Sequence, residues 1–374
     1  MIYLDSAATT LQKPPTVYRA VRSAMATMTS PGRGTYGPAA RASRTLLACR
    51  EAAAALFQVD QPEQVVLTFN ATHGLNLAIH SLVRPGATVL LSGYEHNAVT
   101  RPLAAIPELR LRVVRAPMFC PDLFLEALEH QLNRGVDVVI CTHVSNVFGY
   151  ALPVEEVANL CRQRQVPLIV DASQSAGVLP VTMQAWGAAF VAMPGHKSLY
   201  GPQGTGLLLC REGGEPLLRG GTGSLSRQPE MPDFLPDRLE AGTHNVPGAA
   251  GLLEGLRFLR RRGIAAIRRQ ETALVAQLAR GLDRLPGVQV YAAWEKGCQT
   301  GVLSFRVEGR DCEELGEELG RRGIALRAGL HCAPLAHRTA GTLETGTLRA
   351  SVSAFTTPRE VQEFLRTLGG LLKT

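Results

Sequence analysis

A chain of 374 residues, 45% hydrophobic and 19% charged, has the composition of a well-packed protein, which excludes an intrinsically disordered chain. At roughly 100–200 residues per domain, this length predicts two or three lobes. The net charge of +7 is modest, and the densest basic group, Arg257 to Arg269, alternates with Leu and Ile at helical spacing. We interpret this group as a solvated helix face and expect no nucleic-acid partner.

The amino-terminal residues and the cysteines predict a cytoplasmic protein. Asp5 interrupts the amino-terminal segment before any apolar core, so no signal peptide is expected, and no apolar run approaches the roughly 20 residues of a membrane span. The eight cysteines show no CxxC spacing, which argues against a metal site. We therefore expect buried free thiols in a reducing compartment, with no membrane and no metal.

The predicted elements begin with a short extended piece and a polar turn in residues 1–15. One helix is expected to start within Pro14–Thr16, and a second spans about Ala39 to Phe57. Seven short apolar runs then alternate with helical patterns, which predicts an α/β fold with a mostly parallel, seven-stranded sheet covered on both faces. The runs are Val65–Phe69, Thr88–Ser92, Arg112–Val114, Val136–Thr142, Pro167–Asp171, Ala188–Met193 and Gly206–Cys210.

The rest of the chain predicts a smaller α+β lobe. An irregular segment, Gly220 to Asn245, precedes a long amphipathic helix from about Ala249 to Leu282 that is interrupted near Gly263. We assign residues 16–250 to a large domain and 251–374 to a small one, with residues 1–15 packing near the small domain. Its expected strands are Val288–Ala292, Gly301–Val307, Ile324–Arg327 and Leu348–Val352, and its expected helices are Cys312–Arg322 and Pro358–Leu371.

Polar residues follow the predicted strands at their carboxyl ends, where ligands bind in parallel sheets. Lys197 lies on a loop after a buried run, where an amine can be uncharged often enough to form a Schiff base. Asp171 ends another run, and a buried carboxylate there requires a cationic partner such as a pyridinium nitrogen. The Asn70–Gly74 segment precedes a helix, whose N–H groups suit a phosphate, although helix capping explains Thr72 equally well.

His96 and Asn146 follow two further runs. A phosphate cradle, a histidine that stacks on a ring, an aspartate for a pyridinium and a lysine for a Schiff base are the protein parts that a pyridoxal phosphate (PLP) site needs. The sequence therefore predicts PLP as the cofactor.

These segments resemble the class V aminotransferase group of fold-type I PLP enzymes, and within it the cysteine desulfurase and selenocysteine lyase family. The resemblance runs nearly from end to end. The segments that carry it are Tyr3–Thr10, Tyr94–Asn97, Thr142–Gly149, Val170–Ala176, Gly195–Lys197 and Glu240–Asn245.

The resemblance implies a role for each matching residue. Lys197 would bind the cofactor covalently, Asp171 would pair with its ring nitrogen, and His96 would stack on the ring and help to move protons. Further implied contacts are Asn146 and Gln174 at the phenolic oxygen, Ala71, Thr72 and His196 at the phosphate, and Thr243 at the phosphate of a second copy. A homodimer is therefore implied.

The small lobe indicates the reaction. The Arg327–Leu335 segment resembles the family's R-x-G-x-H-C-A motif, which contains the sulfur-accepting cysteine, here Cys332. Arg327 and His331 would help to keep that thiol ionised. The family arginine that clamps the substrate carboxylate matches Arg349, and Arg327 and Asn146 complete the implied substrate contacts.

Two positions depart from the family pattern at the phosphate. Pro194 stands where a serine is usual and Ala71 where a threonine is usual, so two side-chain donors are missing, and His73 is the expected replacement. A third departure from part of the family is the short segment between Cys332 and Arg349, which resembles SUF-type members. It predicts a cysteine that cannot swing far, and thus a sulfur-acceptor protein that comes to the site.

The predicted function is a PLP-dependent cysteine desulfurase that converts L-cysteine to L-alanine and forms a persulfide on Cys332. A selenocysteine lyase on the same site is the first alternative. A non-catalytic PLP-binding scaffold is the second, because of the missing phosphate donors. Transamination and kynurenine cleavage rank lower, since neither needs Cys332 in this motif.

Overall fold

The computed structural model describes residues 1–32, 34–294 and 297–373. The strands of its large sheet are β2 (Val65–Thr68), β3 (Thr88–Leu91), β4 (Arg110–Val113), β5 (Val138–Thr142), β6 (Leu168–Asp171), β7 (Phe190–Pro194) and β8 (Gly206–Cys210). Their order is β2-β8-β7-β6-β5-β3-β4. Strand β8 is antiparallel to both of its neighbours, β2 and β7, and the other pairs are parallel, so the expected mostly parallel sheet is confirmed.

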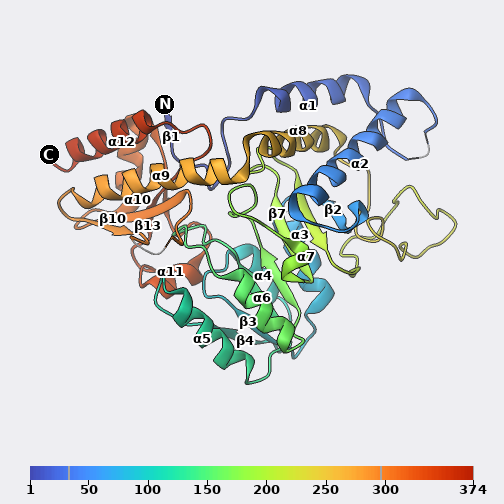
Figure 1. The fold of residues 1–374 in the computed structure, drawn as a ribbon, viewed down its shortest axis with the longest axis horizontal. Coiled ribbons are helices and arrows are strands. Elements are labelled where there is room, and N and C mark those ends of the chain that lie inside the picture. The colour runs from blue at the N-terminus through green and yellow to red at the C-terminus, as the bar shows by residue number, and fades with distance from the viewer. Residues whose placement is uncertain (33, 295–296, 374) are drawn as a thin grey trace.

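Helices cover both faces of this sheet (Figure 1). Val139 packs with side chains of the helices on one face, whereas its neighbours Val138 and Ile140 pack with those on the other, which explains why the strands are apolar throughout. The helices on the first face are α2 (Gly37–Phe57), α5 (Pro121–Leu132), α6 (Val154–Gln163), α7 (Met183–Trp186) and α8 (Val246–Arg262), and on the second α3 (Ala71–Leu82) and α4 (Asn97–Ala104).

A second, antiparallel sheet forms the expected smaller α+β part. Its strands, in the order β12-β13-β10-β9, are β12 (Arg327–Gly329), β13 (Thr347–Ser351), β10 (Val302–Val307) and β9 (Val288–Tyr291). The associated helices are α9 (Ile264–Asp283), α10 (Cys312–Arg321) and α12 (Pro358–Leu371), whereas α11 (Pro334–Ala340) packs against the cores of the large sheet. The domain boundary at residue 250 stays a prediction; it falls within α8, which packs against α1 (Pro15–Thr27) and α2.

The first ten residues connect the small sheet to the Lys197 loop. Strand β1 (Ile2–Tyr3) pairs in parallel with β11 (Ile324–Ala325). Farther along, the backbone N–H of Thr10 donates to the carbonyl of His196 at 3.2 Å. Figure 1 shows both chain termini beside the small sheet.

Three short α-helices of the described residues were not predicted from the sequence pattern, α4, α7 and α11. Two of them follow segments named as functional, since α4 begins directly after His96 and α11 begins two residues after Cys332. None of the helices in the described ranges is long and apolar enough to cross a membrane.

Candidate active site

A pocket of about 210 Å³ lies at the carboxyl ends of the parallel strands of the large sheet, where such folds bind ligands. It brings together every predicted cofactor residue except Thr243. These are Ala71, Thr72, His96, Asn146, Asp171, Gln174, His196 and Lys197.

Lys197 lies on the tight loop that follows β7. Gly195 begins the loop because a Cβ there would overlap the hydroxyl of Thr205. Burial lowers the pKa of the Lys197 amine to about 8, an effect that Arg349 reinforces and Asp171 opposes. No hydrogen bond or ion pair engages this amine within the described residues. It is therefore a nucleophile that is uncharged in a substantial fraction of molecules near neutral pH.

Asp171 ends β6 and is 3% exposed. One carboxylate oxygen, Oδ1, accepts a hydrogen bond from the backbone of Ser173 at 2.9 Å. The other has no hydrogen-bond partner in the part of the chain that the structure describes. A buried carboxylate with a free oxygen beside a pocket favours a cationic ligand group.

His96 is the N-cap of α4, and its Nδ1 accepts a hydrogen bond from the backbone of Ala98 at 3.0 Å. Burial, with a contribution from the Lys197 charge, lowers the pKa of His96 to about 4. The ring is thus neutral and carries its proton on Nε2. It can stack on an aromatic ligand and still donate from Nε2.

Glu95 was not predicted as a site residue, although it precedes His96. It is fully buried, and its Oε1 accepts hydrogen bonds from the backbone of Thr142 at 2.9 Å and from the Ser92 hydroxyl. Burial raises its pKa to about 7, while these hydrogen bonds oppose the rise. Glu95 joins the ends of β3 and β5, where the loops that carry His96 and Asn146 begin. In the sequence, Glu95 could have been identified because it lies within the Tyr94–Asn97 segment, which carries part of the family resemblance.

The predicted phosphate cradle consists mainly of backbone. Asn70 caps α3 through Oδ1, which accepts from the backbone of His73 at 2.9 Å. The N–H groups of Ala71 and Thr72 have no partner within the described ranges, as expected for the first turn of a helix. Ala71 and Pro194 line the pocket without side-chain donors, so the donors that remain available at this end of the pocket are these two backbone N–H groups.

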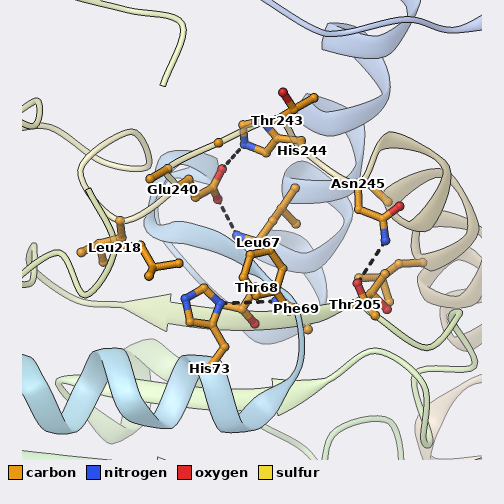
Figure 2. Close-up of a pocket in the computed structure, with 17 residues that line it drawn as sticks. Leu67, Thr68, Phe69, His73, Thr205, Leu218, Glu240, Thr243, His244 and Asn245 are labelled. Atoms are coloured by element: carbon orange, nitrogen blue, oxygen red, sulfur yellow. Dashed lines mark hydrogen bonds and ion pairs between the residues drawn. The ribbon is translucent and has the colours of Figure 1, made fainter. Parts of the chain in front are cut away.

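His73 and Thr243 lie outside this pocket. Both line a second, smaller pocket of about 50 Å³ beside β2 and α3, shown in Figure 2. The His73 ring stacks on Phe69, with 4.6 Å between ring centroids, and its Nδ1 accepts from the Phe69 backbone. The expected replacement of a phosphate donor by His73 is therefore wrong for this conformation, since its ring points away from the cradle.

Cys332 is exposed, and its neighbours differ from expectation. His331 is buried, and its Nε2 lies 3.1 Å from both the carbonyl and the hydroxyl oxygen of Thr347. Burial, reinforced by the charge of Arg349, lowers the pKa of His331 well below its usual value. Its ring is neutral, so it adds no charge to favour a thiolate at Cys332, contrary to the sequence-based expectation.

Arg349 is already partly engaged. Its Nη1 donates to the carbonyl of Asn146 at 2.9 Å and its Nη2 lies 2.8 Å from Oδ1 of Asp5, while Nε is buried and has no hydrogen-bond partner among the described residues. The other oxygen of Asp5 lies 3.2 Å from Arg327. Asp5, which the sequence did not identify as a site residue, thus bridges both arginines predicted to bind a substrate carboxylate.

Comparison with known proteins shows which family this chain belongs to. The family model described as aminotransferase class-V matches residues 2–364. The chain belongs to the class V aminotransferase family, whose members are PLP enzymes.

The similar proteins are named as cysteine desulfurases. A probable cysteine desulfurase of Xylella fastidiosa is 32% identical over 381 residues, covering 98% of this chain and 90% of that protein. One from Methanothermobacter thermautotrophicus is 31% identical, covering 98% and 94%. The apo structure of a cysteine desulfurase from Thermococcus onnurineus has a TM-score of 0.91 and 31% identity, covering all of this chain and 94% of that one.

Proposed function

We propose that this protein is a PLP-dependent cysteine desulfurase that converts L-cysteine to L-alanine and keeps the sulfur as a persulfide on Cys332. The observation that carries the proposal is one pocket in which an unpaired lysine amine lies with Asp171 and His96. The Cys332 segment is joined to that pocket, because Asn146 of its lining donates to the carbonyl of His331 at 2.9 Å. Relatives named cysteine desulfurase over nearly the whole chain support the same reading.

The residues of the pocket fit PLP. The free amine of Lys197 suits its aldehyde, the free oxygen of Asp171 suits its ring nitrogen, and the N–H groups at the start of α3 suit its phosphate. Gln174 and Asn146 also line the pocket and supply amide groups for the phenolic oxygen. When bound, PLP withdraws electrons from the bonds at the substrate's α-carbon.

The protein's own groups then have separate tasks. Lys197, with a pKa of about 8, removes and returns the proton at the α-carbon. The neutral ring of His96 carries a hydrogen on Nε2 and donates a hydrogen bond from it within the same pocket. Arg349 offers its free Nε to the substrate carboxylate, and Arg327 lies on the far side of Asp5.

Sulfur transfer uses Cys332. Its Sγ forms a bond to the substrate sulfur while the bond between that sulfur and the substrate's β-carbon breaks. The Cys332 thiol loses one proton and the β-carbon takes up one. The thiol and L-cysteine become a persulfide and L-alanine, so no external oxidant or reductant is needed. Because Cys332 is exposed, a sulfur-acceptor protein can reach the persulfide from solvent.

A homodimer completes the site in this proposal. Thr243 lines the pocket of Figure 2 and not the pocket of its own chain's Lys197. Phe69 and Leu218 line that same pocket and are 53% and 48% exposed, which is unusual for large apolar side chains. We infer that a second copy covers this face and that Thr243 reaches the partner's phosphate site.

The test is to add L-cysteine to purified protein and to measure L-alanine and the persulfide on Cys332 by mass spectrometry. Cys332→Ala should abolish both products while the absorbance of bound PLP stays. Cys120→Ala is the matched control and should keep both. Sulfide release by Cys332→Ala at the wild-type rate would reject the persulfide route.

The same assay separates the alternatives. Selenocysteine turnover that survives Cys332→Ala, without turnover of cysteine by the wild type, would indicate a selenocysteine lyase. Bound PLP without turnover of either substrate, with a reductant and acceptor proteins present, would indicate a scaffold.

A further inference from the structure

The backbone at Cys332 has an unusual conformation. His331 and Cys332 have φ angles of 49° and 55°, so two successive residues with side chains lie in the left-handed region. Such residues persist only where the surroundings hold them, and they concentrate at functional sites. Neither residue is glycine, so this segment requires groups that fix it.

Two hydrogen bonds hold the carbonyls of this pair. The side chain of Asn146 donates from Nδ2 to the carbonyl of His331 at 2.9 Å. The backbone N–H of Asn97 donates to the carbonyl of Cys332 at 2.8 Å. Both donors follow strands of the large sheet at their carboxyl ends, Asn146 in the loop after β5 and Asn97 at the start of α4 after β3, whereas the acceptors follow β12 of the small sheet.

The second donor belongs to the first turn of α4. Asn97 is the first helical residue, directly after the N-cap His96. An N–H in that position has no partner within its own helix, so it is available to a carbonyl from elsewhere. One helical turn therefore carries the ring of His96 and also holds the backbone of Cys332.

We propose that the backbone N–H of Asn97 is a positioning group for sulfur transfer: it fixes Cys332 relative to His96 and so relative to the substrate. This inference rests on the proposed desulfurase function. The thiol has to meet a sulfur atom at bonding distance, and a misplacement of about 1 Å can cost about 100-fold in rate. The hydrogen bond from Asn146 assists by holding the preceding carbonyl.

The matched variants are Asn97→Pro and Asn97→Ala. Proline is well tolerated as the first helical residue, and His96, with φ −74° and ψ 158°, has a conformation that a following proline allows. Proline removes the N–H and places a ring carbon where the hydrogen pointed, so the Cys332 carbonyl has to move. Alanine keeps the N–H and loses only the side-chain contact with Thr100.

The expected result is that Asn97→Pro forms the Cys332 persulfide at least about tenfold more slowly than Asn97→Ala. The PLP absorbance and the L-cysteine concentration for half-saturation should be alike in the two variants. A general structural defect would instead change the spectrum or the thermal midpoint along with the rate. Equal rates of persulfide formation in the two variants would overturn the proposal.

A readout that needs no turnover keeps the two proposals separable. In the apoprotein of Asn97→Pro, the backbone hydrogens of residues 329–334 should exchange with solvent faster than in Asn97→Ala. The rate at which iodoacetamide alkylates Cys332 should also differ severalfold between the two variants. If the wild type forms no persulfide, the desulfurase proposal fails while these measurements still test the contact. Identical exchange and alkylation in the two variants would refute the positioning role.

Discussion

Two lysines near the pocket, Lys13 and Lys197, both have a pKa lowered to about 8 by burial, but only one amine is free to react. The amine of Lys13 donates to the carbonyl of His196 at 2.8 Å and to Thr10. Through these hydrogen bonds Lys13 holds the loop that contains Lys197. Reactivity at this site therefore depends on hydrogen-bond occupancy as well as on pKa.

This difference predicts the pH dependence of PLP incorporation. Only an uncharged amine adds to an aldehyde, so the rate should rise through about pH 8 and level off above it. The measurement is the rate of the absorbance change after PLP is added to apoprotein between pH 6.5 and 9.5. Lys13→Met should keep the shape of this profile and Lys197→Ala should abolish the change; a flat profile would contradict the prediction.

Glu271 of α9 is a buried acid away from the pocket. Its Oε1 has no partner among the described residues, and burial raises its pKa to about 8. In the unfolded chain its pKa is close to 4.5, so between about pH 4.5 and pH 8 Glu271 is deprotonated in the unfolded state and protonated in the folded state. The free energy of unfolding therefore falls as pH rises from about 4.5 to 8.

Glu271→Gln should remove this pH-dependent loss of stability, because glutamine does not titrate. The free energy of unfolding of the variant minus that of the wild type should increase by about 1.4 kcal/mol for each pH unit from pH 5 to pH 8. Denaturant unfolding at pH 5, 6.5 and 8 measures this difference. A difference that stays constant with pH would show that Glu271 is not protonated in the folded protein.

At the scale of elements, the sequence predicted most strands of the large sheet because their residues are buried on both faces, which produces runs that are apolar throughout. It did not predict the placement of β8 between β2 and β7, since apolar runs contain no information about strand order. Helices α4, α7 and α11 were missed because they have only 8, 4 and 7 residues, and Pro102 lies inside α4.

The site was predictable where a residue follows a strand, as for Lys197, Asp171 and His96. It was not predictable where the direction of a side chain determines whether the residue contributes to the site. His73 follows Thr72 in the chain, but successive helical residues point about 100° apart, so its ring meets Phe69 and not the cradle. Asp5 was missed because its partners, Arg327 and Arg349, are more than 300 residues away in the chain.

The segment that carries Thr243 is tied to α2 by a buried ion pair and to β2 by a hydrogen bond. Glu240 receives two hydrogen bonds from Arg50 of α2, at 2.7 and 2.6 Å, and one from the backbone of Leu67 of β2, and Nε2 of His244 also contacts its Oε2. Arg50→Met should lower the free energy of unfolding by about 3–5 kcal/mol, because it leaves a buried carboxylate without its permanently charged partner.

The double variant Arg50→Met/Glu240→Gln removes the unpaired charge as well. It should therefore lose less stability than Arg50→Met alone in guanidinium titrations. A larger loss in the double variant would show that hydrogen bonds to Glu240 matter more than the charge.

At the scale of the whole molecule, the proposed dimer makes a prediction about mixed chains. Lys197→Ala lacks the reactive amine, and Thr243→Asp places a negative charge where the partner's phosphate is proposed to bind. If Thr243 acts across the interface, a hybrid of the two variants contains one intact site. Random mixing gives hybrids in half of the dimers, so unfolding and refolding an equal mixture should recover about a quarter of wild-type L-alanine formation.

Each variant refolded alone is the control and should form almost no L-alanine. No recovery in the mixture, although both variants refold into dimers, would show that Thr243 acts on its own chain or not at all.

The pairing of β1 with β11 has a consequence for the order in which the protein folds. Ile2 and Tyr3 pair with Ile324 and Ala325, and Asp5 forms a bridge with Ser351. These partners are made more than about 300 residues later than residues 2–5, and closing so long a loop is slow. Residues 2–5 therefore remain unpaired until those partners have been made, and the Lys197 loop obtains its contacts with Thr10 and Lys13 at a late stage of folding.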